Sequence, residues 1–108
     1  MISVGKGKYK VWLKEEVLDN GIILIVCGGE VSHIGSIVLS EPGKKSKIIN
    51  IPKHKEKEIA REFAEKVCLK KKVPVLCVCG MHINSATKKD IKILVSNAKT
   101  LLKKYLSR

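Results

Sequence analysis

Two histidines follow apolar segments that end in glycine, and both have the chemistry to bind a ligand. The stretch CGGEVSHIGSIVLS (27–40) places His33 shortly after two glycines, and CVCGMHINSAT (77–87) places His82 and Asn84 after another. A histidine can be neutral or charged near pH 7, so it can contact a phosphate or the edge of a heterocycle. An asparagine side chain offers both a donor and an acceptor. The residue types therefore predict a site for a small, partly anionic ligand.

The glycines and a predicted helix start favour the same interpretation. Gly28 and Gly29 let the backbone bend and expose successive N–H groups, which can hold a phosphate oxygen. Thr87 is a good N-cap, and the helix that it begins has an electropositive N-terminus. We therefore expect the turns 28–35 and 80–87 to lie side by side. By itself, each histidine favours a structural role, whereas the two matching turns together make a shared site as well supported as a structural role.

Metal binding and catalysis are less well supported by these residues. A tetrahedral set of two thiolates and two imidazoles would come from Cys27, His33, Cys79 and His82. Their spacing matches no known zinc pattern, so we predict no metal site. Glu30, beside a histidine, does not alone make an acid–base pair. We identify no catalytic constellation, and we do not expect an enzyme.

The composition is typical of one globular domain, spanning residues 1–108. The hydrophobic fraction is 44%, which is enough for a core, and the length is too short for two comfortable domains. No apolar run approaches the ~18 residues that cross a membrane, and the N-terminus lacks the apolar segment of a signal peptide. We expect a cytoplasmic protein. The four cysteines lie in apolar runs, so we expect buried free thiols rather than disulfides.

The strong positive charge indicates an anionic partner of some kind. Lys and Arg number 22 against 10 Asp and Glu, which gives a formal net charge of +12. Nucleic acid is one possible partner. However, the only arginines are Arg61 and Arg108, and the lysine runs contain no interleaved aromatic residues. A solvated lysine surface is therefore favoured over nucleic-acid binding, which stays an alternative.

Hydrophobic periodicity predicts an α+β fold. Alternating or continuous apolar residues predict strands over residues 8–19, 21–29, 34–41, 46–52 and 73–81. Amphipathic patterns predict helices over residues 53–70 and 87–106. This order predicts a mostly antiparallel sheet of about five or six strands, in which a meander is joined by one further strand. Both helices are expected to pack on one face of the sheet.

The order of these motifs resembles a known family. The motifs are, in sequence order, Gly28-Gly29, His33-Ile34-Gly35, Gly80, His82-Ile83-Asn84 and Ala86-Thr87, followed by the last amphipathic helix. Together they are similar to the prenylated-flavin chaperone subunit that accompanies gallate-type, prenylated-flavin-dependent decarboxylases. That family resembles the eukaryotic proteasome assembly chaperones in fold. The resemblance extends roughly from Trp12 to Leu106.

The resemblance implies a non-catalytic, homodimeric subunit. Such a protein would bind prenylated FMN or FMN as cargo and deliver it to an apo-decarboxylase. The ligand-contacting residues that it implies are Gly28, Gly29, His33, Gly35, His82 and Asn84. The alternatives are a protein-assembly chaperone without a small ligand and a small basic nucleic-acid-binding protein. An independent enzyme is the weakest alternative, for lack of a catalytic constellation.

Overall fold

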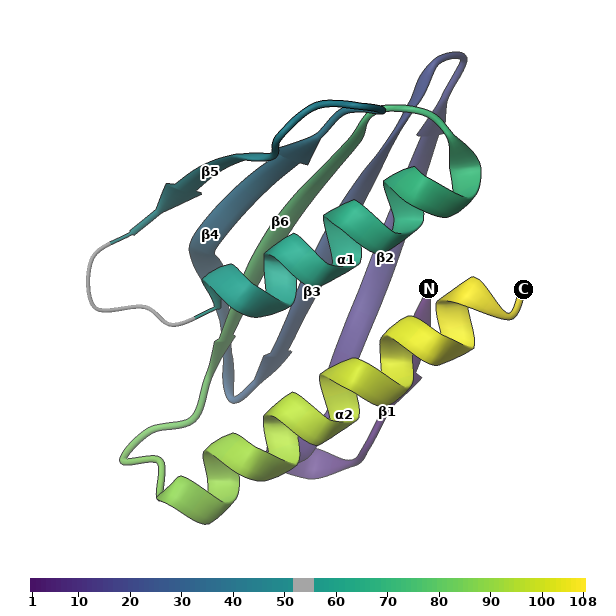
Figure 1. The fold of residues 1–108 in the computed structure, drawn as a ribbon. Helices are drawn as coiled ribbons and strands as arrows, with labels where there is room; N and C mark the ends of the chain where they lie inside the picture. The colour runs from purple at the N-terminus through teal and green to yellow at the C-terminus, as the bar shows by residue number, and fades with distance from the viewer. Residues whose placement is uncertain (52–55) are drawn as a thin grey trace.

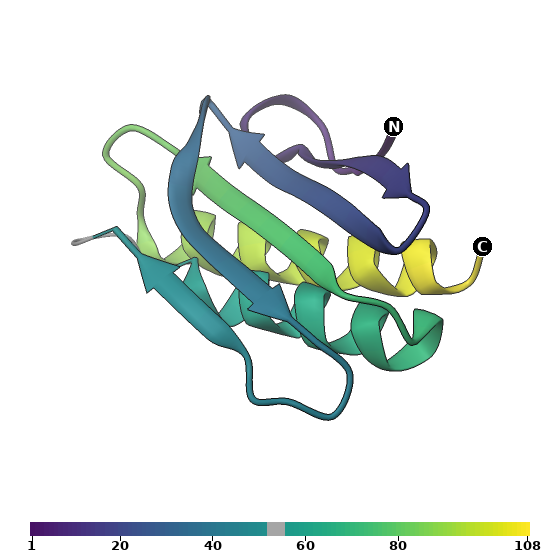
Figure 2. The ribbon, with the colours of Figure 1, turned by 90° about the horizontal axis from the view of Figure 1, so that it is seen from above.

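The computed structural model describes residues 1–51 and 56–108, and it shows a six-stranded sheet with two helices on one face (Figures 1 and 2). The strands are β1 (Ile2–Val4), β2 (Val11–Leu18), β3 (Gly21–Gly29), β4 (Val31–Ser40), β5 (Lys47–Asn50) and β6 (Val75–His82). The helices are α1 (Lys57–Lys71) and α2 (Lys88–Leu106), and a short 3-10 helix, η1 (Gly7–Tyr9), precedes β2. The predicted fold class, α+β with both helices on one side of a mostly antiparallel sheet, is confirmed.

The strand order differs from the predicted meander. The order is β1-β2-β3-β6-β4-β5, with β3 and β6 parallel and the other neighbours antiparallel. The last strand in the sequence therefore lies between two strands that are consecutive in the chain. The short β3–β4 connection crosses the end of β6, because Gly29 and Val31 both pair with His82. The backbone N–H of Glu30 donates to the carbonyl oxygen of His82 across 2.7 Å.

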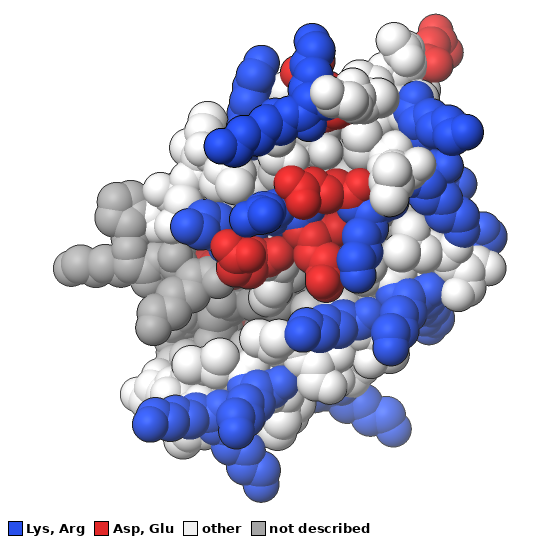
Figure 3. Space-filling model, in the orientation of Figure 1, with Lys and Arg blue, Asp and Glu red and all other residues white. Residues whose placement is uncertain are grey.

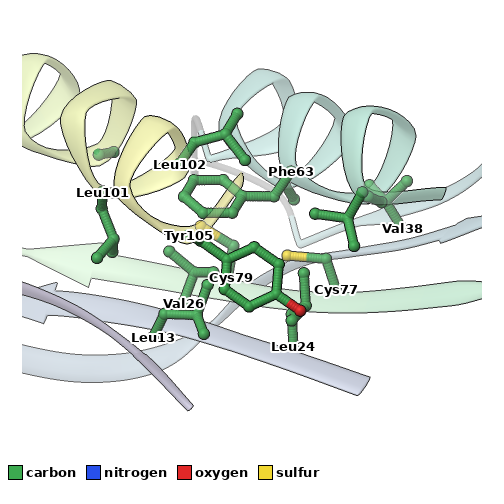
Figure 4. Close-up of a cluster of buried hydrophobic side chains, with 14 of the residues drawn as sticks. Leu13, Leu24, Val26, Val38, Phe63, Cys77, Cys79, Leu101, Leu102 and Tyr105 are labelled. Carbon is green, nitrogen blue, oxygen red and sulfur yellow. The ribbon is translucent and has the colours of Figure 1, made fainter. Parts of the chain in front are cut away.

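One hydrophobic core joins the sheet to the helices. Apolar residues recur at helical spacing along α1, and this stripe contributes Ala60, Phe63, Ala64 and Val67, all buried. They and the buried face of α2 pack against strand side chains, because alternate residues along each strand point toward the helices (Figure 4). Labelled members of this core are Leu13, Leu24, Val26, Val38, Cys77, Cys79, Leu101, Leu102 and Tyr105. Burial of each large aliphatic or aromatic side chain contributes about 1.5–3 kcal/mol to the stability of the fold. The core therefore holds in place the ends of the strands that pass through it. No described helix is long and apolar enough to cross a bilayer.

The cysteines belong to this packed interior or its edge. All four are free and buried, as the sequence predicted. Burial raises the pKa of the thiols of Cys27, Cys77 and Cys79. Thiols in apolar surroundings are poor nucleophiles because the thiolate is disfavoured there. The cysteines therefore act as small apolar residues of the core.

Several element boundaries differ from the predicted ones. The strand predicted over 8–19 begins only at Val11, since η1 takes the preceding residues. The three-residue β1 was not predicted, because so short a segment carries little periodicity. The strand predicted over 34–41 begins already at Val31, so its first residues form strand instead of a turn.

The segment between β5 and α1 limits two further predictions. The strand predicted over 46–52 ends at Asn50 in the structure. Residues 52–55, which include the expected start of the helix predicted over 53–70, lie outside the described residues. Within the described part of the chain, α1 begins one residue after Glu56.

Candidate functional site

The two histidine motifs meet at one end of the sheet. His33 comes from β4 and His82 is the last residue of β6. Their ring centroids are 6.2 Å apart, with an edge-on interplanar angle of 79°. The structure therefore brings together two residues that are far apart in the sequence. His33 lies within an irregular part of β4, where the register with β6 shifts between Ser32 and Ser36.

A glycine on β6 permits this irregularity. A Cβ added to Gly80 would lie 1.7 Å from the carbonyl oxygen of His33. Only a residue without a side chain lets the two backbones approach so closely. The close approach holds the His33 backbone over β6, and the His33 ring then reaches the end of that strand.

The ring of His33 contacts a carboxylate that the sequence analysis did not single out. His33 Nε2 lies 3.3 Å from Glu56 Oε1 and 3.4 Å from the carbonyl oxygen of Met81. Glu56 Oε1 also accepts a long hydrogen bond of 3.4 Å from the backbone N–H of Met81. Glu56 is only 8% exposed, and its other oxygen, Oε2, has no hydrogen-bond partner among the described residues.

A second acidic residue connects the ends of β3 and β6. Glu30 Oε1 accepts a hydrogen bond of 2.8 Å from the backbone N–H of Asn84. His82 Nε2 lies 3.1 Å from Asn84 Oδ1, so the imidazole donates to this oxygen when Nε2 carries the proton. The exposed rim of the site is thus organised by contacts between the two motifs.

The predicted glycines have structural reasons that involve the chain itself. Gly29 has a φ of +77°, and its added Cβ would meet the His82 carbonyl oxygen at 2.4 Å. The corresponding position on Gly28 is 2.4 Å from the carbonyl oxygen of Lys10. A Cβ added to Gly35 would lie 2.4 Å from Glu56 Oε2. Contact of these glycines with a ligand stays a prediction.

A cavity of about 340 Å³ adjoins the histidines, between β6 and the starts of both helices. Ligand sites typically have volumes of about 300–1,000 Å³, with mostly apolar linings and a few polar groups. This lining has that character: Glu56, Ile59, Met81, His82, Ile83, Ser85, Ala86, Ile91, Leu94 and Val95. Ile91 on α2 is 50% exposed and borders this cavity.

The predicted site residues stand in different relations to this cavity. His82 lines it, and His33 contacts Glu56, which also lines it. The other four predicted residues are not among its lining residues. A larger hollow of about 460 Å³ lies between α1 and α2, but charged side chains dominate its lining and no histidine borders it. The smaller cavity is therefore the better candidate for a ligand site.

The start of α2 carries a capping box, in which the predicted N-cap Thr87 is paired with Asp90. Thr87 Oγ1 accepts from the backbone N–H of Asp90 across 3.1 Å, and Asp90 Oδ2 accepts from the backbone N–H of Thr87 across 3.0 Å. Tyr9 donates its hydroxyl hydrogen to Asp90 Oδ1 across 2.7 Å. The hydrogen bond from this hydroxyl is the main reason why the pKa of Asp90 is lowered to about 2. The helix N-terminus thus already faces one anion, which weakens its predicted attraction for a phosphate.

We expect Asp90→Asn to reduce the acid sensitivity of the fold. The pKa of Asp90 falls from 3.8 to about 2 on folding, so its stabilising contribution is complete above pH 3.8 and is lost as the pH falls toward 2. Urea unfolding midpoints at pH 5, 3.5 and 2 should therefore change less in this variant than in the wild type. Asp19→Asn, in the exposed β2–β3 turn, is the control and should follow the wild type. Parallel curves for Asp90→Asn and wild type would contradict this role.

The four residues considered as metal ligands do not form a metal-binding cluster in the structure: Cys27, His33, Cys79 and His82. Among residues 1–51 and 56–108, no group of three or more His, Cys, Asp and Glu side chains is placed to hold a metal ion. Cys27 Sγ instead lies 3.9 Å from the carbonyl oxygen of His33.

The face that carries the helices is rich in basic side chains, with acidic side chains gathered near its middle (Figure 3). The acidic side chains of α1 are partly paired on the same helix, for example Glu62 with Lys66 at 3.5 Å. The lysines of α2 are Lys88, Lys89, Lys92, Lys99, Lys103 and Lys104. Both signs of charge share this face, so it is not a uniform surface for a polyanion.

A family model described as the prenylated flavin chaperone LpdD-like domain matches residues 5–108. The chain belongs to this family. The matched residues include both histidine motifs, the residues that line the cavity, and α2. The match confirms the resemblance drawn from the sequence. None of the curated proteins matches the chain. The likeness in fold to proteasome assembly chaperones stays a prediction.

Proposed function

We propose that the protein is a non-catalytic chaperone that binds prenylated FMN, or FMN, as cargo. It delivers this flavin to an apo-decarboxylase of the prenylated-flavin-dependent class. The observation that best supports this function is the cavity of about 340 Å³ beside His82, in a chain of the prenylated flavin chaperone family. The residues proposed to contact the flavin are Gly28, Gly29, His33, Gly35, His82 and Asn84.

The residues present suit such a ligand. Apolar side chains such as Ile59, Met81 and Ile91 line the cavity and can cover a flat ring system, whose removal from water is favourable. His82 at its border can meet a polar ring edge. Exposed Lys88 and Lys89 begin α2 and can attract the phosphate, since the net charge of +12 speeds the capture of a dianion.

The same region offers little to a chemical reaction. The thiol of Cys27, whose Sγ lies 3.9 Å from the carbonyl oxygen of His33, is buried, and burial raises its pKa. The His33 ring is engaged with Glu56 and Met81. A site that holds and shields a reactive flavin needs these features, whereas catalysis needs an accessible nucleophile or base.

We expect His33→Ala and His82→Ala each to weaken flavin retention. Each substitution removes a polar partner of the bound flavin, which costs about 1–3 kcal/mol of binding free energy, and the double variant should retain almost none. The wild type, purified from cells that make prenylated flavin, should carry flavin absorbance in about equimolar amount. The measurement is the ratio of flavin to protein absorbance after gel filtration.

Glu62→Ala on the exposed part of α1 is the matched control and should retain flavin fully. Circular dichroism establishes that each variant is folded. Unchanged retention in the folded double variant would contradict the histidine site. Wild type that binds an apo-decarboxylase but never flavin would favour an assembly chaperone without a small ligand. Tight binding to DNA or RNA that salt abolishes, without flavin affinity, would favour the nucleic-acid alternative.

We further propose that the chain forms a homodimer through the sheet face opposite the helices. Side chains alternate between the two faces of a strand, and no described helix covers this face (Figure 2). Its side chains are mostly apolar: Trp12, Ile23, Ile25, Ile37, Leu39, Ile49, Leu76 and Val78. So large an apolar surface is typical of an interface.

Charge favours a second copy as the occupant of this face. Lys14 and Glu16 lie two residues apart on β2 and point to the same side. A two-fold axis can therefore place the lysine of one copy opposite the glutamate of the other. The lysines of α2 lie on the opposite side of the sheet, so two copies packed through their sheets keep these charges apart.

A further inference from the structure

The buried carboxylate of Glu56 has few hydrogen-bond donors among the described residues. Its Oε1 has two long contacts, 3.3 Å to His33 Nε2 and 3.4 Å to the backbone N of Met81. Its Oε2 is buried and has no hydrogen-bond partner within the described part of the chain. An ionised carboxylate can accept about four hydrogen bonds. Buried polar groups in native proteins are nearly always satisfied, so an exception calls for a ligand, a water or another explanation.

The position of this carboxylate points to a ligand. Glu56 borders the cavity of about 340 Å³, and its side chain is only 10% exposed. The chain has 22 Lys and Arg residues, yet His33 is the one basic residue seen to pair with Glu56 in the described residues. Among the described residues, no lysine or arginine forms an ion pair with this carboxylate. A donor that enters the cavity would supply what it lacks.

We propose that Glu56 accepts a hydrogen bond from the imide N–H of the flavin ring, and so selects the orientation of the ring in the cavity. This inference rests on the proposed flavin-binding function. A carboxylate repels a phosphate, so the phosphate end of the ligand lies away from Glu56. The imide N–H is a neutral donor at the end of the flat ring system, and it is present in FMN and in its prenylated form alike.

The surroundings of Glu56 favour a ring over a flexible polar chain. Ile59 on α1 and Met81 on β6 line the same cavity, so a donor carried by a flat apolar ring can reach the carboxylate while its faces stay out of water. The final torsion of a glutamate side chain is broad and roughly two-fold. Either oxygen of Glu56 can therefore turn toward the donor without a change in the backbone. His33 then keeps the carboxylate in place.

The test compares FMN with N3-methyl-FMN, which lacks the imide hydrogen. Dissociation constants are measured by flavin fluorescence titration on the full chain. We expect the wild type to bind N3-methyl-FMN about tenfold to 100-fold more weakly than FMN, the usual effect of leaving a buried acceptor unmatched. Glu56→Ala should bind FMN more weakly and should no longer distinguish the two ligands. Glu58→Ala is the matched control, because its side chain is 71% exposed in the same first turn of α1; it should behave as the wild type.

The outcomes distinguish failure of the proposed Glu56 contact from failure of the proposed flavin binding. Equal affinity of the wild type for both ligands overturns the role of Glu56 and leaves flavin binding intact. Discrimination that persists in Glu56→Ala assigns the imide contact to another residue and also overturns the proposal. Absence of any FMN binding by the wild type contradicts the proposed function itself, and the inference fails with it. The wild-type comparison needs no variant, so it remains decisive even if Glu56→Ala fails to fold.

Discussion

Gly80→Ala is expected to remove a large part of the stability of the fold. An added Cβ would lie 1.7 Å from the carbonyl oxygen of His33 and 2.5 Å from its carbonyl carbon. Both atoms belong to the backbone of β4, so no side-chain rotation can relieve the overlap. Overpacked cores lose about 1–3 kcal/mol and sometimes more, and we expect a loss above about 3 kcal/mol, out of the ~5–15 kcal/mol typical of a domain. Urea unfolding monitored by circular dichroism measures the change.

Gly21→Ala provides the control for this substitution. Gly21 is also buried, at the start of β3, but the nearest atom to its added Cβ is the carbonyl oxygen of Pro74 at 3.4 Å. We expect it to change the unfolding free energy by less than about 1 kcal/mol. Any Gly80→Ala protein that remains folded should have a displaced His33 ring and weaker flavin retention. Near-wild-type stability of Gly80→Ala would contradict the close approach of β4 to β6.

The pattern of apolar residues in the sequence predicted much of this architecture. The continuous apolar run that ends at Gly29 predicted a strand, and β3 lies inside the sheet between β2 and β6; its face toward the helices is buried, whereas Ile23 and Ile25 on the other face are only partly buried. The periodicity around Phe63 and Leu101 predicted the two helices, because these side chains must face a common core. The Thr87 cap predicted the start of α2 to the residue. Such signals are local, so one segment suffices to show them.

Strand pairing was the part of the fold that local pattern did not determine. A meander is the simplest connection of consecutive strands, but β6 pairs with both β3 and β4. The apolar residues of β6 are compatible with any central place in the sheet. The place is decided by the short connection at Glu30, which crosses the end of β6, and by Gly80, which allows β4 to approach. Both effects depend on contacts between residues about 50 positions apart.

The candidate site was predictable only in part, for the same reason. The repeated pattern of glycine followed by histidine drew attention to His33 and His82, and the structure places the two rings side by side. Glu56 carried no such signal, since it belongs to a run of alternating lysines and glutamates that is typical of a solvated surface. Its burial comes from the way the start of α1 packs over Gly35 and Met81. A lone acidic residue that lacks an adjacent motif is identified only by its tertiary environment.

Ile25→Glu is expected to convert a dimer into monomers. Ile25 pairs in register with Val78 on β6, near the middle of the proposed interface. A carboxylate at this position would be buried without a partner when two sheets pack face to face, which costs about 3–5 kcal/mol. Because each 1.4 kcal/mol changes an equilibrium constant tenfold, the dimer should dissociate about 100-fold to 4,000-fold more readily. Sedimentation equilibrium at micromolar concentration should show twice 12.0 kDa for the wild type and 12.0 kDa for the variant.

Leu69→Glu separates this effect from a general change in charge or hydrophobicity. Leu69 lies on α1, is 80% exposed, and belongs to the helix side of the molecule, so its variant should remain dimeric. Charge reversal by Lys14→Glu and Glu16→Lys tests the proposed interface more directly. Each single reversal places like charges opposite each other across the two-fold axis and should weaken the dimer, whereas the double reversal restores opposite charges and should recover it. A wild type that sediments as a monomer, or a double reversal no better than either single one, would rule out this face as the site of self-association.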